Sequence, residues 1–264
     1  MRDIFDYTLL DSLIDQQAYL ENSPYPFALF DNLFDNSILK EAINEIGDKK
    51  FPMDMRNIPS EEVKARSAFE SIEQIPEALF RIFSVLNGGR FLDALTRLSA
   101  IDGLISDPYF SGGGINEITK NGKLAVHVDG TTHHKMGVKR RINAILFLND
   151  NWDDSWAGFH EQWEPSNYYD KKLLDHKSDW RCIRMIKPIY NRLLIFTTND
   201  FSWHGHTKLL NAPDGITRKS LITYYYTSSR PETDLLFDEP HRALFVDNDL
   251  CVSKDSYDDC QIIV

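Results

Sequence analysis

Apolar residues recur every three to four positions in much of the first hundred residues, a spacing that predicts amphipathic helices. Helices are expected over residues 37–46, 76–86 and about 90–98, with a shorter one around residues 9–19. Asn87-Gly88-Gly89 separates the second from the third, because glycine ends helices. We interpret these helices as a layer that buttresses one face of a sheet.

Three local signals refine this first part of the chain. Asn36 or Ser37 can cap the helix over residues 37–46, and Gly47 can end it. Residues 27–34 are apolar enough for a strand, whereas residues 49–71 are polar and charged and are expected to be irregular.

From about residue 103 the pattern changes to short apolar runs separated by Gly, Pro, Asn and Asp. Strands are expected over residues 124–129, 192–198 and 218–227, and several such strands are typical of a jelly-roll-like core. Residues 209–216 are turn-rich, so the last two strands are expected to form an antiparallel pair. The pattern predicts an α+β fold.

We divide the chain into three parts of one domain. Residues 1–100 form an N-terminal buttress of helices and a strand, and residues 101–230 form the β-core. Residues 231–264 form an acidic C-terminal tail, with nine acidic and two basic residues. Its hydrophobic residues predict partial packing against the core, since a disordered tail would be poorer in them.

Composition narrows the class of protein. The chain has 264 residues, 42% of them hydrophobic, which suits a packed soluble core, and its net charge of −11 argues against nucleic-acid binding. No stretch is long and apolar enough for a membrane span, and the N-terminus lacks the apolar run of a secretory signal. The three cysteines form neither a zinc pattern nor a disulfide framework, which favours a cytoplasmic location.

A His-x-Asp pair with a distant histidine carries the strongest chemical signal. His127 and Asp129 lie two positions apart in a predicted strand, so both side chains can point to one side. With His204 they would supply two imidazoles and one carboxylate, a set that binds one face of Fe(II) and leaves the other open. Arg218 follows the connection after His204 and could hold a dicarboxylate at that open face.

His206 leaves one alternative for the second imidazole. It lies two residues after His204, so in a strand either ring could face the metal. If His206 is not the ligand, it is expected to lie next to the ligands or to face the substrate.

Six segments extend this signal into a family resemblance. The chain resembles the prolyl-4-hydroxylase-like branch of the iron/2-oxoglutarate dioxygenases, whose motifs appear in the same order over roughly residues 100–230. The matching segments are Asp107–Gly114, Leu124–Asp129, Arg141–Asp150 followed by Trp152, Asn191–Phe196, Trp203–His206, and Thr217–Leu221 with Tyr224–Tyr226.

The resemblance implies a double-stranded β-helix with a bound metal and a co-substrate. His127, Asp129 and His204 would be the Fe(II) ligands and Arg218 the 2-oxoglutarate anchor. O2 would be the second co-substrate, and ascorbate is a further cofactor to be tested. Because relatives that halogenate usually lack the carboxylate, Asp129 favours hydroxylation.

The chain departs from the family pattern at two places, Phe147 and Ala157-Gly158. Phe147 stands where many prolyl hydroxylases have a co-substrate-binding Tyr, and Ser220 could supply a hydroxyl to the 2-oxoglutarate carboxylate instead. Asn143 could approach the same carboxylate or be a core amide bonded to backbone. Ala157-Gly158 replaces the usual glycine pair.

The leading hypothesis is a hydroxylase that releases succinate and CO2, acting on a prolyl residue of a peptide or protein. The alternatives are the same chemistry on a free amino acid, a sugar or a secondary metabolite, or a metal-binding jelly-roll protein without activity. The segment over residues 149–179 could border the active-site mouth or be a surface loop. It carries five aromatic residues: Trp152, Trp156, Trp163, Tyr168 and Tyr169.

Overall fold

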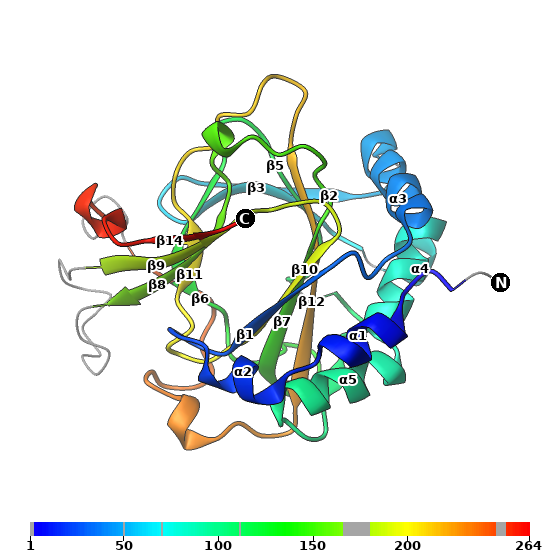
Figure 1. Cartoon of the computed structure of the whole chain (residues 1–264), viewed down its shortest axis with the longest axis horizontal. Coiled ribbons are helices and arrows are strands. Elements are labelled where there is room, and N and C mark those ends of the chain that lie inside the picture. The colour runs from blue at the N-terminus through cyan, green and yellow to red at the C-terminus, as the bar shows by residue number, and fades with distance from the viewer. Residues whose placement is uncertain (1–2, 50, 70, 111, 166–179, 247–251) are drawn as a thin grey trace.

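A strongly curled sheet forms the body of the protein, with helices along one of its faces (Figure 1). The computed structural model describes residues 3–49, 51–69, 71–110, 112–165, 180–246 and 252–264. Tyr168 and Tyr169 lie outside the described residues. The helices are α1 (Tyr7–Leu13), α2 (Gln16–Glu21), α3 (Asn36–Asp48), α4 (Glu77–Leu86) and α5 (Gly89–Ser99).

Fourteen described strands join one mixed sheet, which curls into a double-stranded β-helix. They are β1 (Phe27–Asp31), β2 (Met53–Ile58), β3 (Glu62–Ser67), β4 (Ile105–Ser106), β5 (Gly114–Ile118), β6 (Lys123–Val128), β7 (Lys139–Phe147), β8 (His160–Pro165), β9 (Trp180–Ile186), β10 (Arg192–Thr197), β11 (His204–His206), β12 (Arg218–Thr227), β13 (Leu244–Phe245) and β14 (Gln261–Ile263). The main path runs β1-β10-β7-β12-β5-β3-β6-β11-β8-β9-β14. The fold expected from the family resemblance is therefore confirmed.

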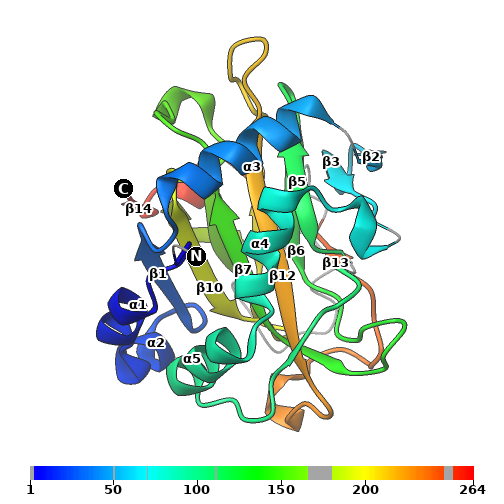
Figure 2. The ribbon, with the colours of Figure 1, turned by 90° about the vertical axis from the view of Figure 1, so that its right-hand side faces the viewer.

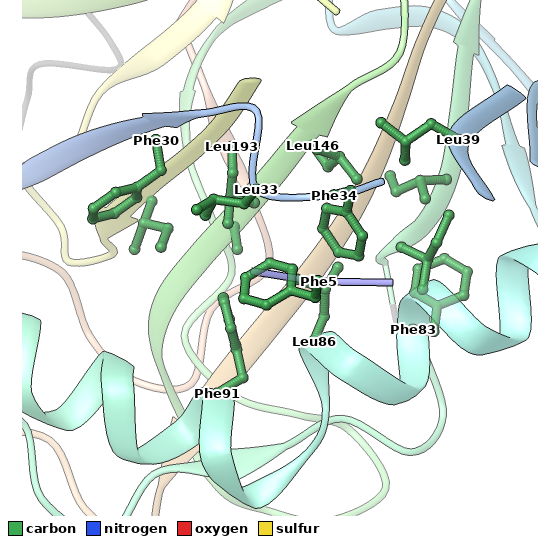
Figure 3. Packing of buried hydrophobic residues seen from close by; sticks show 14 of the residues in the cluster. Phe5, Phe30, Leu33, Phe34, Leu39, Phe83, Leu86, Phe91, Leu146 and Leu193 are labelled. Carbon is green, nitrogen blue, oxygen red and sulfur yellow. The ribbon is translucent and has the colours of Figure 1, made fainter. Parts of the chain in front are cut away.

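The helices bury one face of the strands β10, β7 and β12 (Figure 2). Residues of α4 at helical spacing, including Leu79, Ile82, Phe83 and Leu86, are all buried. Figure 3 shows Phe83, Leu86 and Phe91 of the helices on one side and Leu146 and Leu193 of the strands on the other, with Phe5 and Phe34 between them. This packing fixes one wall of the curled sheet.

The helices predicted over residues 37–46, 76–86 and 90–98 are confirmed, with small shifts at the ends, whereas the one expected around residues 9–19 is two short helices, α1 and α2, separated by extended Ile14 and Asp15. The helix expected over residues 37–46 is α3, but Asp35 is its cap, since its carboxylate accepts from the Ser37 backbone N–H. Helix α3 continues through Gly47 and ends before Lys49, which has a left-handed backbone. Glu45 of α3 in turn accepts from the first backbone N–H groups of α4. The described part of the chain contains no helix long and apolar enough to cross a membrane.

Two sequence-based predictions about the sheet are wrong. The region over residues 49–71, expected to be irregular, contains the hairpin β2–β3, and β3 pairs with β5 and β6. Strands β10 and β12 do not pair with each other, because β7 lies between them and pairs with both.

Candidate active site

Two neighbouring strands bring the candidate metal ligands together. His127 on β6 lies directly opposite His204 on β11 in the antiparallel register, so their rings lie 4.3 Å apart. Asp129 follows β6 on the same side as His127. One ligand atom from each of the three residues lies within 4.8 Å of the others, a spacing suited to a single metal ion.

Backbone carbonyls fix the orientation of both imidazoles. Nδ1 of His127 lies 2.9 Å from the Ala125 carbonyl oxygen, and Nδ1 of His204 lies 2.9 Å from that of Ser202. Because a carbonyl oxygen only accepts, each Nδ1 carries the proton and each Nε2 offers a lone pair. The two Nε2 atoms each lie 4.0 Å from an Asp129 carboxylate oxygen.

Charge and burial hold the three groups in the protonation states that metal ligands need. Burial lowers the pKa of His127 to about 3, helped by the nearby His204, and burial also lowers the pKa of His204. Burial alone would raise the pKa of Asp129, but Arg140 and the two histidines together lower it. Asn143 adds a hydrogen bond of 3.1 Å from Nδ2 to Asp129 Oδ2.

Arg218 lies in the same cavity as the three ligand candidates, at the start of β12. Its Nε donates to the Gly158 carbonyl oxygen at 2.6 Å, and its guanidinium carbon lies 5.1 Å from the centre of the Phe147 ring. Gly158 has a φ of +75°, and a Cβ there would come within 2.9 Å of Leu210 Cδ1 and 3.2 Å of Arg218 Cδ, so this position favours glycine. Burial lowers the pKa of Arg218 to about 10, so it stays charged at neutral pH.

Two polar side chains near Arg218 are buried without a partner in the described structure. They are Ser220 Oγ on β12 and the amide of Asn116 on β5, and the two residues are directly opposite in the register. Buried polar groups normally make hydrogen bonds, so unpaired ones in a cavity are available to a ligand. The cavity itself has a volume of about 710 Å³.

The structure brings all six sequence-predicted site residues to one cavity. His127, Asp129, Asn143, His204, Arg218 and Ser220 all line it. Asn143 bonds to Asp129, a partner that neither interpretation of the sequence named. His206 also lines the cavity, but its two ring nitrogens have no hydrogen-bond partner among the described residues, and it is not part of the metal-ligand group.

Among the cavity residues that sequence reasoning missed are Asn116, Arg140 and His160. His160 on β8 stacks on His204 with ring centres 5.4 Å apart. None of the three belongs to a spacing motif, because strands distant in the sequence bring them in. Of the aromatic segment, Trp163 is buried in a core cluster and Trp152 packs beside Trp156, so these side chains are core or loop packing.

Comparison with known proteins finds one family with a similar sequence and a set of solved structures with a similar fold. Residues 113–226 match the model of the family described as the 2OG-Fe(II) oxygenase superfamily. No curated protein matches the sequence.

Solved structures with a similar fold come from proteins of different activities. A prolyl hydroxylase from Trichoplax adhaerens, in complex with a hypoxia inducible factor oxygen degradation domain peptide fragment, has a TM-score of 0.55 and 14% identity over 82% of this chain and 90% of that chain. HygX from Streptomyces hygroscopicus, with nickel, 2-oxoglutarate and hygromycin B bound, has a TM-score of 0.51 and 13% identity over 88% of this chain and 95% of that chain. The alpha ketoglutarate dependent epimerase SnoN from nogalamycin biosynthesis has a TM-score of 0.52 and 12% identity over 90% of this chain and 94% of that chain.

At these identities the likeness to solved structures shows a shared fold. The family match covers β5 through most of β12, which includes all the sequence-predicted site residues. Over residues 113–226, this chain is therefore similar to the 2OG-Fe(II) oxygenase superfamily.

Proposed function

We propose that this chain binds Fe(II) through His127, Asp129 and His204 and uses 2-oxoglutarate and O2 to hydroxylate a C–H bond. The observation that carries the proposal is the meeting of these three side chains within 4.8 Å, in a cavity that also contains Arg218. Two neutral imidazoles and one carboxylate match the donor preference of Fe(II). A metal site without a co-substrate would not need the buried guanidinium.

The bound metal and co-substrate supply the oxidising chemistry, in which 2-oxoglutarate becomes succinate and CO2 and one oxygen atom of O2 enters the substrate. The protein's part is to hold the ligands and to position the reactants. Asn143 and Arg140 hold the Asp129 carboxylate from two sides, at 3.1 and 3.3 Å. The carbonyls of Ala125 and Ser202 orient the two imidazoles.

Arg218 and Ser220 are the proposed binding groups for 2-oxoglutarate. The Nε bond to Gly158 orients the guanidinium, and its remaining N–H groups can donate to the distal carboxylate as a charge-assisted pair. Ser220 Oγ is buried and unpaired, so it can donate to the same carboxylate in place of the tyrosine hydroxyl that Phe147 lacks.

Loss of single ligands tests the metal site. Alanine at His127, Asp129 or His204 should lose Fe(II) binding or turnover, because each variant removes one of the three proposed protein ligands. His206→Ala is the matched control, since His206 lies on the same strand as His204 and should leave Fe(II) binding intact. Metal content after anaerobic loading and succinate formation would be measured. Binding lost in His206→Ala but kept in His204→Ala would overturn this assignment.

Two classes of substrate fit the proposed reaction, prolyl peptides and small molecules. The structurally similar proteins include one solved with a peptide and one solved with hygromycin B, so the fold accepts both peptides and small molecules. Succinate release by the Fe(II)-loaded protein, measured across prolyl peptides and small metabolites with and without ascorbate, separates them. Mass spectrometry should show one oxygen atom added to the true substrate. Coupled product from small molecules alone would reject the prolyl substrate and keep the oxygenase.

A further inference from the structure

Arg140 places a second guanidinium beside the candidate metal site. It lies on β7, its side chain is 11% exposed, and its Nη1 is 3.3 Å from Asp129 Oδ1. Its guanidinium carbon stacks 3.7 Å from the centre of the Tyr224 ring, which fixes the plane of the group. Its Nε has no hydrogen-bond partner among the described residues.

Metal binding changes the charge around Arg140. The carboxylate that pairs with it is Asp129, one of the proposed metal ligands. When that carboxylate binds a dication, the cation takes up its negative charge, and Arg140 keeps its positive charge in a low-dielectric place. Arg140 still contacts Asp129 and Tyr224, but a buried charge whose carboxylate partner is shared with a dication is less well compensated, so the metal-loaded site favours a further anion at Arg140.

The other charged side chains that line the cavity are also mostly positive. Six cationic side chains line it, against three carboxylates: Arg56, Lys64, Arg66, Arg140, Arg218 and Arg242, against Glu61, Glu62 and Asp129. The hairpin β2–β3 supplies three of the cations, which are paired with Glu62 and Asp54, so the unbalanced positive charge comes from Arg140, Arg218 and Arg242. Bound 2-oxoglutarate and the metal dication would offset each other, which leaves the cavity positive on a chain whose net charge is −11. Such a local field draws in anions.

We propose that the substrate hydroxylated at this site is a small molecule with a carboxylate or phosphate group, and that Arg140 binds this group beside the metal. The inference rests on the proposed function. A planar guanidinium donates paired hydrogen bonds to either kind of anion. An internal prolyl residue carries neither group, so the inference favours small acids and phosphorylated metabolites over prolyl peptides.

Paramagnetic relaxation tests where an anion binds without requiring the true substrate. Mn(II) replaces Fe(II) at a concentration below that of the protein, and saturating 2-oxoglutarate occupies Arg218. Inorganic phosphate is then titrated and its ³¹P relaxation recorded, with ¹³C-labelled acetate as the carboxylate arm. We expect saturable relaxation enhancement for at least one of these two anions, and the arm that responds identifies the kind of group. The Zn(II)-loaded protein is the diamagnetic control.

Variants connect the signal to Arg140. Arg140→Gln should weaken the binding of the responding anion at least tenfold, while the hydrogen bond from Asn143 still holds Asp129 in place. Arg66 contacts none of the proposed metal ligands. Arg66→Gln should therefore weaken anion binding several-fold, only by reducing the positive electrostatic field of the cavity. Arg81→Gln on α4 is the matched control, because Arg81 does not line the cavity, and it should have no effect. Mn(II) and 2-oxoglutarate affinities are measured for every variant.

The outcomes separate this inference from the function it rests on. A protein that binds neither Mn(II) nor 2-oxoglutarate overturns both. A protein that binds both but enhances neither anion's relaxation overturns only the anionic substrate. So does an anion affinity that is equal in the wild-type, Arg140→Gln and Arg66→Gln proteins.

Discussion

One side chain, Arg218, is buried with its Nε already bonded to the Gly158 carbonyl, so its orientation is set before any ligand arrives. Arg218→Ala should weaken 2-oxoglutarate binding roughly ten- to hundredfold, since a hydrogen bond to a charged group is worth about 1.5–3 kcal/mol. Fe(II) binding should survive. Anaerobic titration of the Fe(II)–2-oxoglutarate charge-transfer band measures both. Lys219→Ala is the control, because Lys219 is adjacent but is not part of the cavity lining; an unchanged affinity in Arg218→Ala would place the anchor elsewhere.

The cavity histidines make the metal-free protein sensitive to acid. Burial lowers the pKa values of His127, His160, His204 and His206. Below about pH 6.5 the unfolded chain binds protons at these residues that the folded chain does not, so stability falls as the pH falls. Each histidine contributes up to about 1.4 kcal/mol per pH unit in that window.

Urea unfolding of the metal-free protein at about pH 7.5 and pH 5.5 measures this loss, which should amount to several kcal/mol. His206→Gln should reduce the loss by about 1 kcal/mol, because it removes one of the four groups. Equal stability at the two pH values would mean that these rings are protonated in the folded state.

At the scale of elements, the sequence predicts helices and strands best where the apolar positions are those that pack in the core. The predicted strand over residues 218–227 is β12, residue for residue, because it pairs with β7 along its length and its Leu221 and Tyr225 pack in the core under the helices. The two spaced histidines and Asp129 could be recognised as ligand candidates from their spacing and family resemblance.

The hairpin β2–β3 could not be predicted in this way. It alternates charged residues, among them Asp54, Arg56, Glu62, Lys64 and Arg66, because it lines the cavity and meets solvent instead of burying an apolar face. The pairing of β10 with β12 failed for a different reason. A short turn-rich connection favours neighbours, but β7, from much earlier in the chain, enters between them.

The inserted strand β3 leads to a stability prediction. Ala65 is buried and lies opposite both Met55 and Glu117 in the sheet, so Ala65→Pro should lower the free energy of unfolding by about 1–3 kcal/mol, because proline cannot donate a hydrogen bond to a neighbouring strand. Met55→Ala is the control, since the Met55 side chain is 69% exposed, and should change it by less than about 0.5 kcal/mol. Urea unfolding of both variants decides whether β3 belongs to the sheet: equal stability would exclude it.

At the scale of the whole molecule, the C-terminal tail packs against the strands that carry the candidate ligands. Phe245 stacks on His127 with ring centres 5.0 Å apart, and β13 pairs with β6. Further along, Tyr257 lies edge-on to Trp163 and donates to Glu161 at 3.4 Å. The tail therefore connects the candidate site to the far edge of the sheet, where β14 pairs with β9.

Two cysteines at that edge lead to the last prediction. Cys182 on β9 and Cys260 just before β14 are free thiols 78 positions apart, yet their sulfur atoms lie 2.7 Å apart. Oxidation by diamide should remove one hydrogen from each thiol and join the two sulfur atoms, with diamide reduced to the hydrazine. Closing so long a loop restricts the unfolded chain and should add up to about 4 kcal/mol of stability.

The experiment uses the Cys251→Ser background, so that only this pair remains. Thiol titration should show two thiols lost, and the melting temperature should rise and return after dithiothreitol. Cys182→Ser in the same background should show neither change, because Cys260 would then have no intramolecular partner. Two titratable thiols remaining after diamide would mean that β14 does not hold Cys260 beside β9, and that the tail is not fixed at this edge of the sheet.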